Sequence, residues 1–181
     1  FQFYSHDPKD PTSLSNNQVR SVIVDDRNFL WVSTFGGGLD KMSYDRKRGW
    51  KKIQNWRHNP GRPNSLPGND IIHMIQGRSG KIWIAMYLDG LLQLDPATGQ
   101  LNRFGELAGD PFDYKDIWAL CEDRNGYLWI GTFAASFYRL DSRSGTIKNF
   151  STQIGEPEVS YDIITNIYED RQGALWICTN S

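Results

Sequence analysis

The chain has 181 residues, of which 39% are hydrophobic, and its formal net charge at pH 7 is −1. This length and apolar content are sufficient for one domain with a buried core. The balanced charge argues against nucleic acid or an anionic membrane surface as a partner. No apolar run approaches the ~18 residues that a membrane-spanning helix needs.

A short apolar phrase centred on tryptophan occurs four times along the chain. Its copies are centred on Trp31, Trp83, Trp129 and Trp176, which lie 46 to 52 residues apart. The phrase is rich in β-branched residues and too short for a helix, so it predicts a buried β-strand. Strand-rich repeats of this period are typical of propeller blades.

Alignment on the tryptophans predicts four strands in each unit, here called a to d, with the tryptophan phrase as strand b. The turn between strands a and b ends in Asn28, Gly80, Gly126 or Gly173, and these residue types suit a positive φ. We therefore predict an all-β fold, a β-propeller fragment of four-stranded antiparallel blades with about four blade equivalents.

The predicted boundaries follow from the same alignment. We expect a stray outer strand at residues 1–4, blade 1 at 19–56, blade 2 at 71–104, blade 3 at 117–150 and the first two strands of blade 4 at 164–179. Such a segment has unpaired apolar ends, which favour association. We therefore expect the rest of a larger propeller to cover these ends.

The repeat resembles the two-component regulator propeller repeat. Unit three carries the phrase EDRNGYLWIGT at residues 122–132, and residues 13–17 read SLSNN. Unit two departs from the pattern, with Gln76-Gly77-Arg78 where Glu-Asp-Arg is expected. The resemblance implies the periplasmic sensor region of a Bacteroides-type hybrid two-component system. Such proteins sit in the inner membrane, carry downstream kinase domains, act as homodimers and regulate polysaccharide use.

Strand direction predicts which loops share a face. Neighbouring antiparallel strands place the b–c links and the long d–a links on one face of the disc, opposite the a–b and c–d turns. Aromatic rings with nearby Arg and Asp suit sugar rings and their hydroxyls. We therefore expect a ligand site on the link face, formed by Phe35, Tyr87, Asp89 and Phe133 of the b–c links and by Arg57, His58, Arg62, Tyr114 and Trp118 on or beside the d–a links.

Several of these residues also have a structural interpretation. His58 has a counterpart, His6, in the same proline-bearing link, and Tyr87 and Phe133 could cap the hydrophobic layers. His73 in strand a could face either the channel or a neighbouring blade. The turn aspartates offer one carboxylate per hairpin, too few oxygens for calcium, so we expect each to bind its own backbone.

Signatures of catalysis are absent from the sequence. It has no nucleophile elbow, zinc-binding His-Glu-x-x-His or phosphate loop, so we expect no catalytic residue, metal or cofactor in this segment. The main hypothesis is a sensor that binds a carbohydrate degradation product and biases a bistable dimer. Two alternatives stay open: a protein-binding propeller scaffold and a propeller-type carbohydrate-active enzyme such as a lyase.

Overall fold

The computed structural model describes residues 1–104, 116–133, 136–150 and 163–180. Blade 1 consists of β1 (Val19–Val24), β2 (Leu30–Thr34), β3 (Gly38–Asp45) and β4 (Gly49–Trp56). Blade 2 consists of β5 (Ile71–Gln76), β6 (Ile82–Met86), β7 (Gly90–Leu94) and β8 (Leu101–Phe104). Blade 3 consists of β9 (Ile117–Glu122), β10 (Tyr127–Thr132), β11 (Phe137–Asp141) and β12 (Ile147–Asn149). The last pair is β13 (Ile163–Glu169) and β14 (Leu175–Asn180).

The strands form three four-stranded sheets and one two-stranded sheet, and every pair of neighbours is antiparallel. Each four-stranded sheet keeps its strands in chain order, so strand a lies at one edge and strand d at the other. This confirms the predicted all-β propeller blades. No described residue belongs to a helix that is long and apolar enough to cross a membrane.

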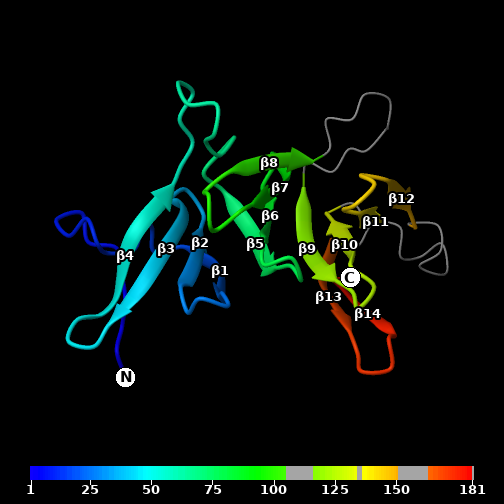
Figure 1. Cartoon of the computed structure of the whole chain (residues 1–181), viewed down its shortest axis with the longest axis horizontal. Coiled ribbons are helices and arrows are strands. Elements are labelled where there is room, and N and C mark those ends of the chain that lie inside the picture. Colours follow the sequence, from blue (N-terminus) through cyan, green and yellow to red (C-terminus); the bar gives the residue numbers. More distant parts are fainter. Residues whose placement is uncertain (105–115, 134–135, 151–162, 181) are drawn as a thin grey trace.

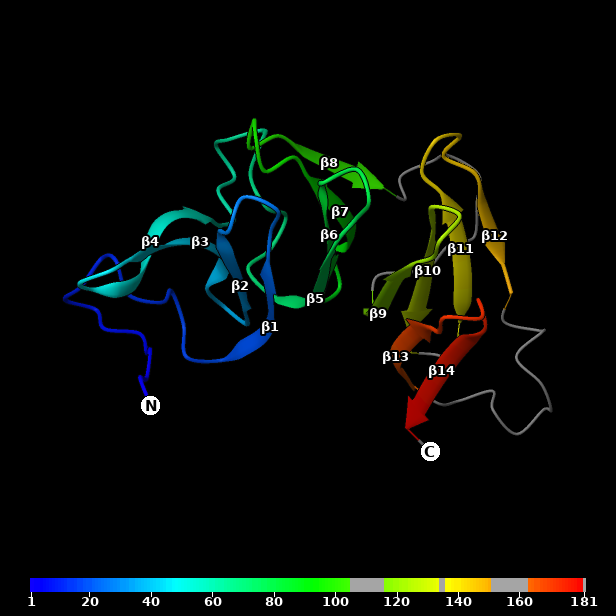
Figure 2. The same ribbon diagram turned by 60° about the horizontal axis from the view of Figure 1, so that its bottom comes forward.

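The blades stand side by side around an open arc. β1 contacts β5, β5 contacts β9 and β9 contacts β13, so the four a strands line the inner side of the arc. Figures 1 and 2 show blade 1 and the β13–β14 pair on opposite sides of blade 2, with no closed ring. The link that joins β4 to β5 meets the b–c link of blade 1 on one face, where the Gly36 and Gly38 N–H groups donate to the Asn69 carbonyl at 3.2 and 3.0 Å.

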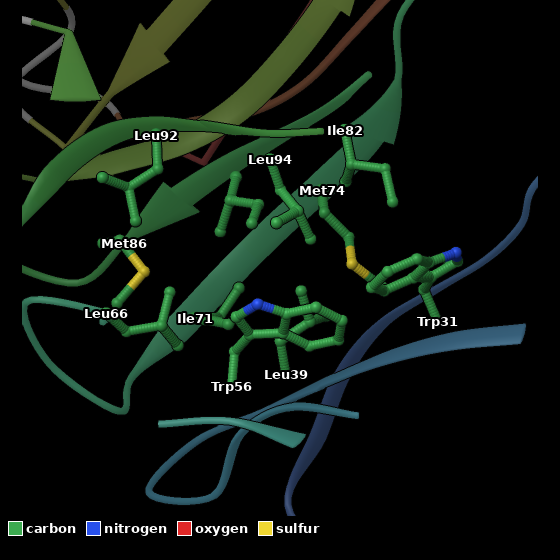
Figure 3. Packing of buried hydrophobic residues seen from close by; sticks show 11 residues of the cluster. Trp31, Leu39, Trp56, Leu66, Ile71, Met74, Ile82, Met86, Leu92 and Leu94 are labelled. Carbon is green, nitrogen blue, oxygen red and sulfur yellow. The ribbon is translucent and has the colours of Figure 1, made fainter. Parts of the chain in front are cut away.

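The strand b tryptophans of blades 1, 2 and 3 are each buried against the following blade. Trp31 packs with Met74 and Ile82 of blade 2, and its ring centroid is 5.2 Å from that of Trp56 (Figure 3). Trp83 packs in the same way against blade 3, and Trp129 against the β13–β14 pair. Blades 2 and 3 therefore have a neighbouring sheet on each face, which explains the apolar residues on both sides of their strands a and b.

The two ends of the arc lack such a cover among the described residues. Trp176 is 62% exposed, whereas Trp31 is fully buried. Val22 and Val24 of β1 are 52% and 55% exposed. These side chains form two apolar faces, one at each end of the row of blades.

The expected outer strand at residues 1–4 is not formed. A strand d pairs with the c strand of its own blade, and β3, β7 and β11 already have neighbours on both sides. The segment instead lies beside blade 1, where the Tyr4 hydroxyl accepts a hydrogen bond of 3.1 Å from the Trp50 backbone N–H.

The a–b turns have the predicted geometry. Asn28, Gly80, Gly126 and Gly173 have φ values of 62°, 77°, 83° and 91°. Asp25 Oδ1 accepts the backbone N–H groups of Arg27 and Phe29, each at 2.9 Å. Asp123 and Asp170 do the same in their own turns. The expectation that these aspartates bind their own backbone is thus confirmed.

Candidate functional site

Three aromatic residues occupy equivalent places on the link face. Phe35, Tyr87 and Phe133 each stand four residues after the strand b tryptophan. Their backbone N–H groups donate to the carbonyls of Gln18, Asp70 and Asp116, which lie at the start of strand a, at 2.9, 2.8 and 3.0 Å. The repeat therefore places one aromatic side chain per blade next to the inner strands.

These rings meet further aromatic and charged groups. The centroids of Phe35 and Tyr87 are 5.7 Å apart, and those of Trp118 and Phe133 are 6.2 Å apart. The guanidinium carbon of Arg20 lies 5.9 Å from the Trp118 ring centroid. Arg20 belongs to β1 and Trp118 to β9, two blades apart, so this contact spans the inner side of the arc.

Two polar atoms beside these rings are buried and have no hydrogen-bond partner among the described residues. They are Asp116 Oδ1 and Trp118 Nε1. Buried polar atoms in folded proteins are nearly always paired, so such an exception calls for an explanation. Asp116 supplies an acceptor and Trp118 a donor, which together match the two hydrogen-bonding roles of a hydroxyl group. We call Phe35, Tyr87, Asp116, Trp118 and Phe133, together with Arg20, the axial aromatic cluster.

The other candidates lie around the long link between blades 1 and 2. The His58 ring Nδ1 is 2.9 Å from the Leu66 carbonyl, and its backbone N–H donates to Asn69 Oδ1 at 2.8 Å. His6 makes the same two contacts with Leu14 and Asn17, at 2.6 and 2.7 Å. The shared pattern shows that both histidines hold their links in shape.

Arginine side chains of this link differ in their roles. Arg57 Nη2 donates to the Gly36 carbonyl at 3.1 Å and so ties the link to the b–c link of blade 1. The exposed Arg62 guanidinium has no ion-pair partner among the described residues. Tyr114 lies outside the described residues.

Asp89 stands near the same link and is exposed. Partial burial of its carboxyl raises the pKa above its ordinary value, while the nearby Arg103 and His58 act in the opposite direction. The structure thus brings Phe35, Tyr87, Trp118 and Phe133 together on the axial side, and places His58 and Asp89 as a separate outer group.

His73 of β5 faces the neighbouring blade. Its Nδ1 accepts a hydrogen bond of 3.2 Å from the Leu120 backbone N–H of β9, and burial lowers its pKa. A neutral imidazole can accept this bond and a doubly protonated one cannot. Among the described residues, no group of three or more His, Cys, Asp or Glu could hold a metal ion.

Three segments of the sequence match a known family. Residues 13–36, 111–134 and 158–181 match the family described as two component regulator propeller. These three segments are thus similar to the two-component regulator propeller repeat.

Solved structures share the fold of these repeats. One is described as the extracellular domain of the hybrid two component system BT3049 from B. thetaiotaomicron, with a TM-score of 0.80 and 23% identity over 99% of this chain. A second, BT4673 from the same organism, gives 0.75 and 20% over 99%. This chain spans 23% of the length of each.

An enzyme also shares the fold. Virginiamycin B lyase from Staphylococcus aureus has a TM-score of 0.66 and 15% identity over 98% of this chain, which spans 53% of the lyase. Comparison with curated proteins gave no match. At these identities the likeness concerns the fold of the repeats alone.

Proposed function

We propose that these repeats form part of the extracytoplasmic, periplasmic ligand-binding propeller of a bacterial hybrid two-component signalling protein. The family match and the two hybrid two-component neighbours support this assignment. In such a protein the propeller binds a ligand and biases a dimer that controls a downstream kinase. The propeller segment itself carries out no reaction.

The ligand in this proposal is a carbohydrate degradation product, bound at the axial aromatic cluster. The observation that carries it is the pair of unpartnered buried atoms, Asp116 Oδ1 and Trp118 Nε1, beside the exposed rings of Tyr87 and Phe133. Sugar rings have apolar faces that stack on aromatic side chains, and their hydroxyls need a donor and an acceptor at fixed positions. Arg20 adds a further donor above the Trp118 ring.

The experiment is calorimetric titration of the intact protein with a panel of oligosaccharides. Trp118→Phe removes the indole N–H and reduces the bicyclic ring to a single ring, Asp116→Asn removes the carboxylate charge, and Tyr87→Ala removes a ring. We expect each to weaken binding at least tenfold while the melting temperature changes little. Thr98→Ala, in a c–d turn on the opposite face, is the matched control and should leave affinity unchanged. Equal affinity in all four variants would exclude the cluster as the site.

The same titration distinguishes two alternative functions from ligand sensing. The first is an enzyme: the virginiamycin B lyase neighbour is an enzyme that shares the fold, and product formation from a bound oligosaccharide would establish a carbohydrate-active enzyme here. A protein-binding scaffold would bind no oligosaccharide of the panel and would capture a protein through the same face.

We also propose that further blades of the same propeller cover the exposed Trp176 and the valines of β1. The support is that Trp31, Trp83 and Trp129 are all buried by a following blade. The neighbours with hybrid two-component descriptions are about four times as long as this chain, which leaves room for such blades.

A further inference from the structure

The a–b turns contain a repeated arrangement of three N–H donors around one carboxylate. In blade 1, Asp25 accepts the N–H groups of Arg27 and Phe29 through Oδ1 and the indole N–H of Trp31 through Oδ2, the last at 2.8 Å. Asp123 in blade 3 and Asp170 in the last pair accept the equivalent three donors, with indole bonds also of 2.8 Å. The turn is thus a cradle of the right size for one carboxylate.

Blade 2 keeps this cradle and lacks the carboxylate. Gly77 takes the place of the aspartate, and the equivalent donors are the backbone N–H groups of Ser79 and Lys81 and the indole N–H of Trp83. None of the three has a hydrogen-bond partner in the described part of the chain. Trp83 is only 2% exposed overall, and it lines a cavity that opens beside its N–H group. An unpaired donor in such a place favours any acceptor that can reach it.

A cavity of about 310 Å³, lined by two of these donor residues, Ser79 and Trp83, opens between blades 2 and 3. Its lining includes Trp83, Gln93, Glu122 and the three arginines Arg78, Arg124 and Arg143. Arg124 pairs with Glu169 at 2.7 Å, and Arg78 Nε donates to the Asp123 carbonyl at 3.0 Å. The Arg143 guanidinium has no ion-pair partner among the described residues. The lining therefore carries an excess of positive charge.

Glu122 forms the wall of the cavity next to Gly77. Its Oε2 accepts the Arg78 backbone N–H at 2.9 Å and lies in contact with the position that a Gly77 side chain would take. Glu169 makes the equivalent contact with the Arg124 backbone N–H, at 2.8 Å, beside an intact Asp123. In blade 3 a glutamate at this place coexists with a carboxylate in the cradle, whereas in blade 2 the flexible end of Glu122 overlaps the position of a Gly77 Cβ and has to shift when a carboxylate enters.

We propose that the cavity between blades 2 and 3 binds a small ligand through a carboxylate, which takes the place that Asp25, Asp123 and Asp170 occupy in the other turns. One carboxylate oxygen accepts the two backbone N–H groups and the other accepts the Trp83 indole N–H. The arginines contribute the positive field, and Gln93 offers an amide to the rest of the ligand. This site lies on the turn face, opposite the axial aromatic cluster, and does not depend on the function proposed for that cluster.

The test is an NMR titration of the intact protein with ¹⁵N-labelled tryptophan, in which Trp83→Phe assigns the Trp83 indole signal. Acetate and glucuronate both carry a carboxylate, whereas glucose does not, and sulfate tests a general effect of anions. We expect a saturable downfield shift of the Trp83 signal with acetate and glucuronate, and a tighter response to glucuronate if the sugar ring contacts the cavity. Glucose and sulfate should produce no such shift.

Two variants decide the interpretation. Gly77→Asp supplies an internal carboxylate, so its Trp83 signal should lie with those of Trp31 and Trp129 without ligand and should respond at least tenfold more weakly. Glu122→Gln should bind the probes more tightly, because a like charge is removed.

The proposal is wrong if the probes move the signal equally in Gly77→Asp, if sulfate reproduces the shift, or if no probe moves it. It is also wrong if Glu122→Gln shifts the signal upfield before any probe is added, since Glu122 would then be the acceptor. Tyr87→Ala should leave the titration unchanged, which separates this site from the axial aromatic cluster.

Discussion

Blades 1 and 3 surround their central tryptophan with charge, and blade 2 does not. Trp31 donates to Asp25, and Lys41, its partner across the β2–β3 ladder, lies with Nζ 5.0 Å from the ring centroid. Trp129 donates to Asp123, and Arg139 lies 5.6 Å from its ring centroid. In both blades an anion binds the edge of the indole and a cation lies over a face.

Blade 2 has neither charge. Gly77 stands at the place of the aspartate, and Gln93 pairs across the ladder with Trp83 at the place of the cation. Asp25, Lys41 and Asp123 are at least nine-tenths buried, and a buried charge without its counterpart is costly. The difference indicates that the anion and the cation act as a unit, and that a blade retains both or neither.

The largest expected effect tests what the tryptophan itself contributes. Trp129→Ala should lower the free energy of unfolding by about 3–5 kcal/mol, the range for a buried large aromatic. Trp176 has the same place in its sheet but is 62% exposed, so Trp176→Ala should cost much less. Urea denaturation of both variants measures the difference. Similar losses would mean that packing against a following blade does not stabilise strand b.

A smaller effect tests whether the two charges act as a unit. Asp123→Gly should cost about 1–3 kcal/mol, because it leaves the Trp129 indole and the Tyr127 N–H without an acceptor. Arg139→Gln should also destabilise the protein. The double variant reproduces the composition of blade 2 and should lose at least about 0.5 kcal/mol less than the sum, as expected for residues that share a partner. Additive losses would refute the idea of a coupled pair.

The sequence predicted the repeat well because each blade is a local unit. The tryptophan alignment located the strands, and the residue types at Asn28, Gly80, Gly126 and Gly173 predicted the positive φ values. The bond from aspartate to indole was missed, although its signal was present: an aspartate six residues before tryptophan occurs in three of the four units. Only the function of that aspartate in the turn was recognised.

Contacts between blades were harder to predict. Arg20 meets Trp118 across the inner side of the arc, and Glu122 reaches the turn of the preceding blade. Such contacts depend on the curvature of the whole row of blades, which the spacing within a unit does not contain. The sequence held one signal for the first of these contacts: Arg20 and Trp118 occupy the same place in strand a of their two units. The expected outer strand at residues 1–4 is absent for a related reason. A strand d pairs with the c strand of its own blade, and β3, β7 and β11 already have neighbours on both sides.

Restoring the aspartate in blade 2 gives a stabilising prediction. Gly77→Asp should raise the free energy of unfolding by about 0.5–1 kcal/mol, through less freedom in the unfolded chain and an acceptor for the Trp83 indole. The Gly77 backbone has no positive φ, and the nearest obstacle is the flexible end of Glu122. Gly77→Ala is the matched control: it restricts the chain without an acceptor and should stabilise less. A melting temperature equal to that of Gly77→Ala would show that the carboxylate contributes nothing.

The smallest effect concerns pH. The Trp176 indole bond, and then the backbone N–H groups of Ala174 and Gln172, lower the pKa of the Asp170 carboxyl below its ordinary value of 3.8. A group whose folded pKa is lowered stabilises the protein fully above its ordinary pKa, and this contribution is lost as the pH falls through the folded pKa. The Trp176 indole NMR signal should therefore stay constant down to about pH 4 and shift below it. This step should disappear in Asp170→Asn, and the Trp83 signal should gain one in Gly77→Asp. Persistence of the Trp176 step in Asp170→Asn would mean that another group controls it, and that the carboxylate cradle is not what distinguishes blade 2 from its neighbours.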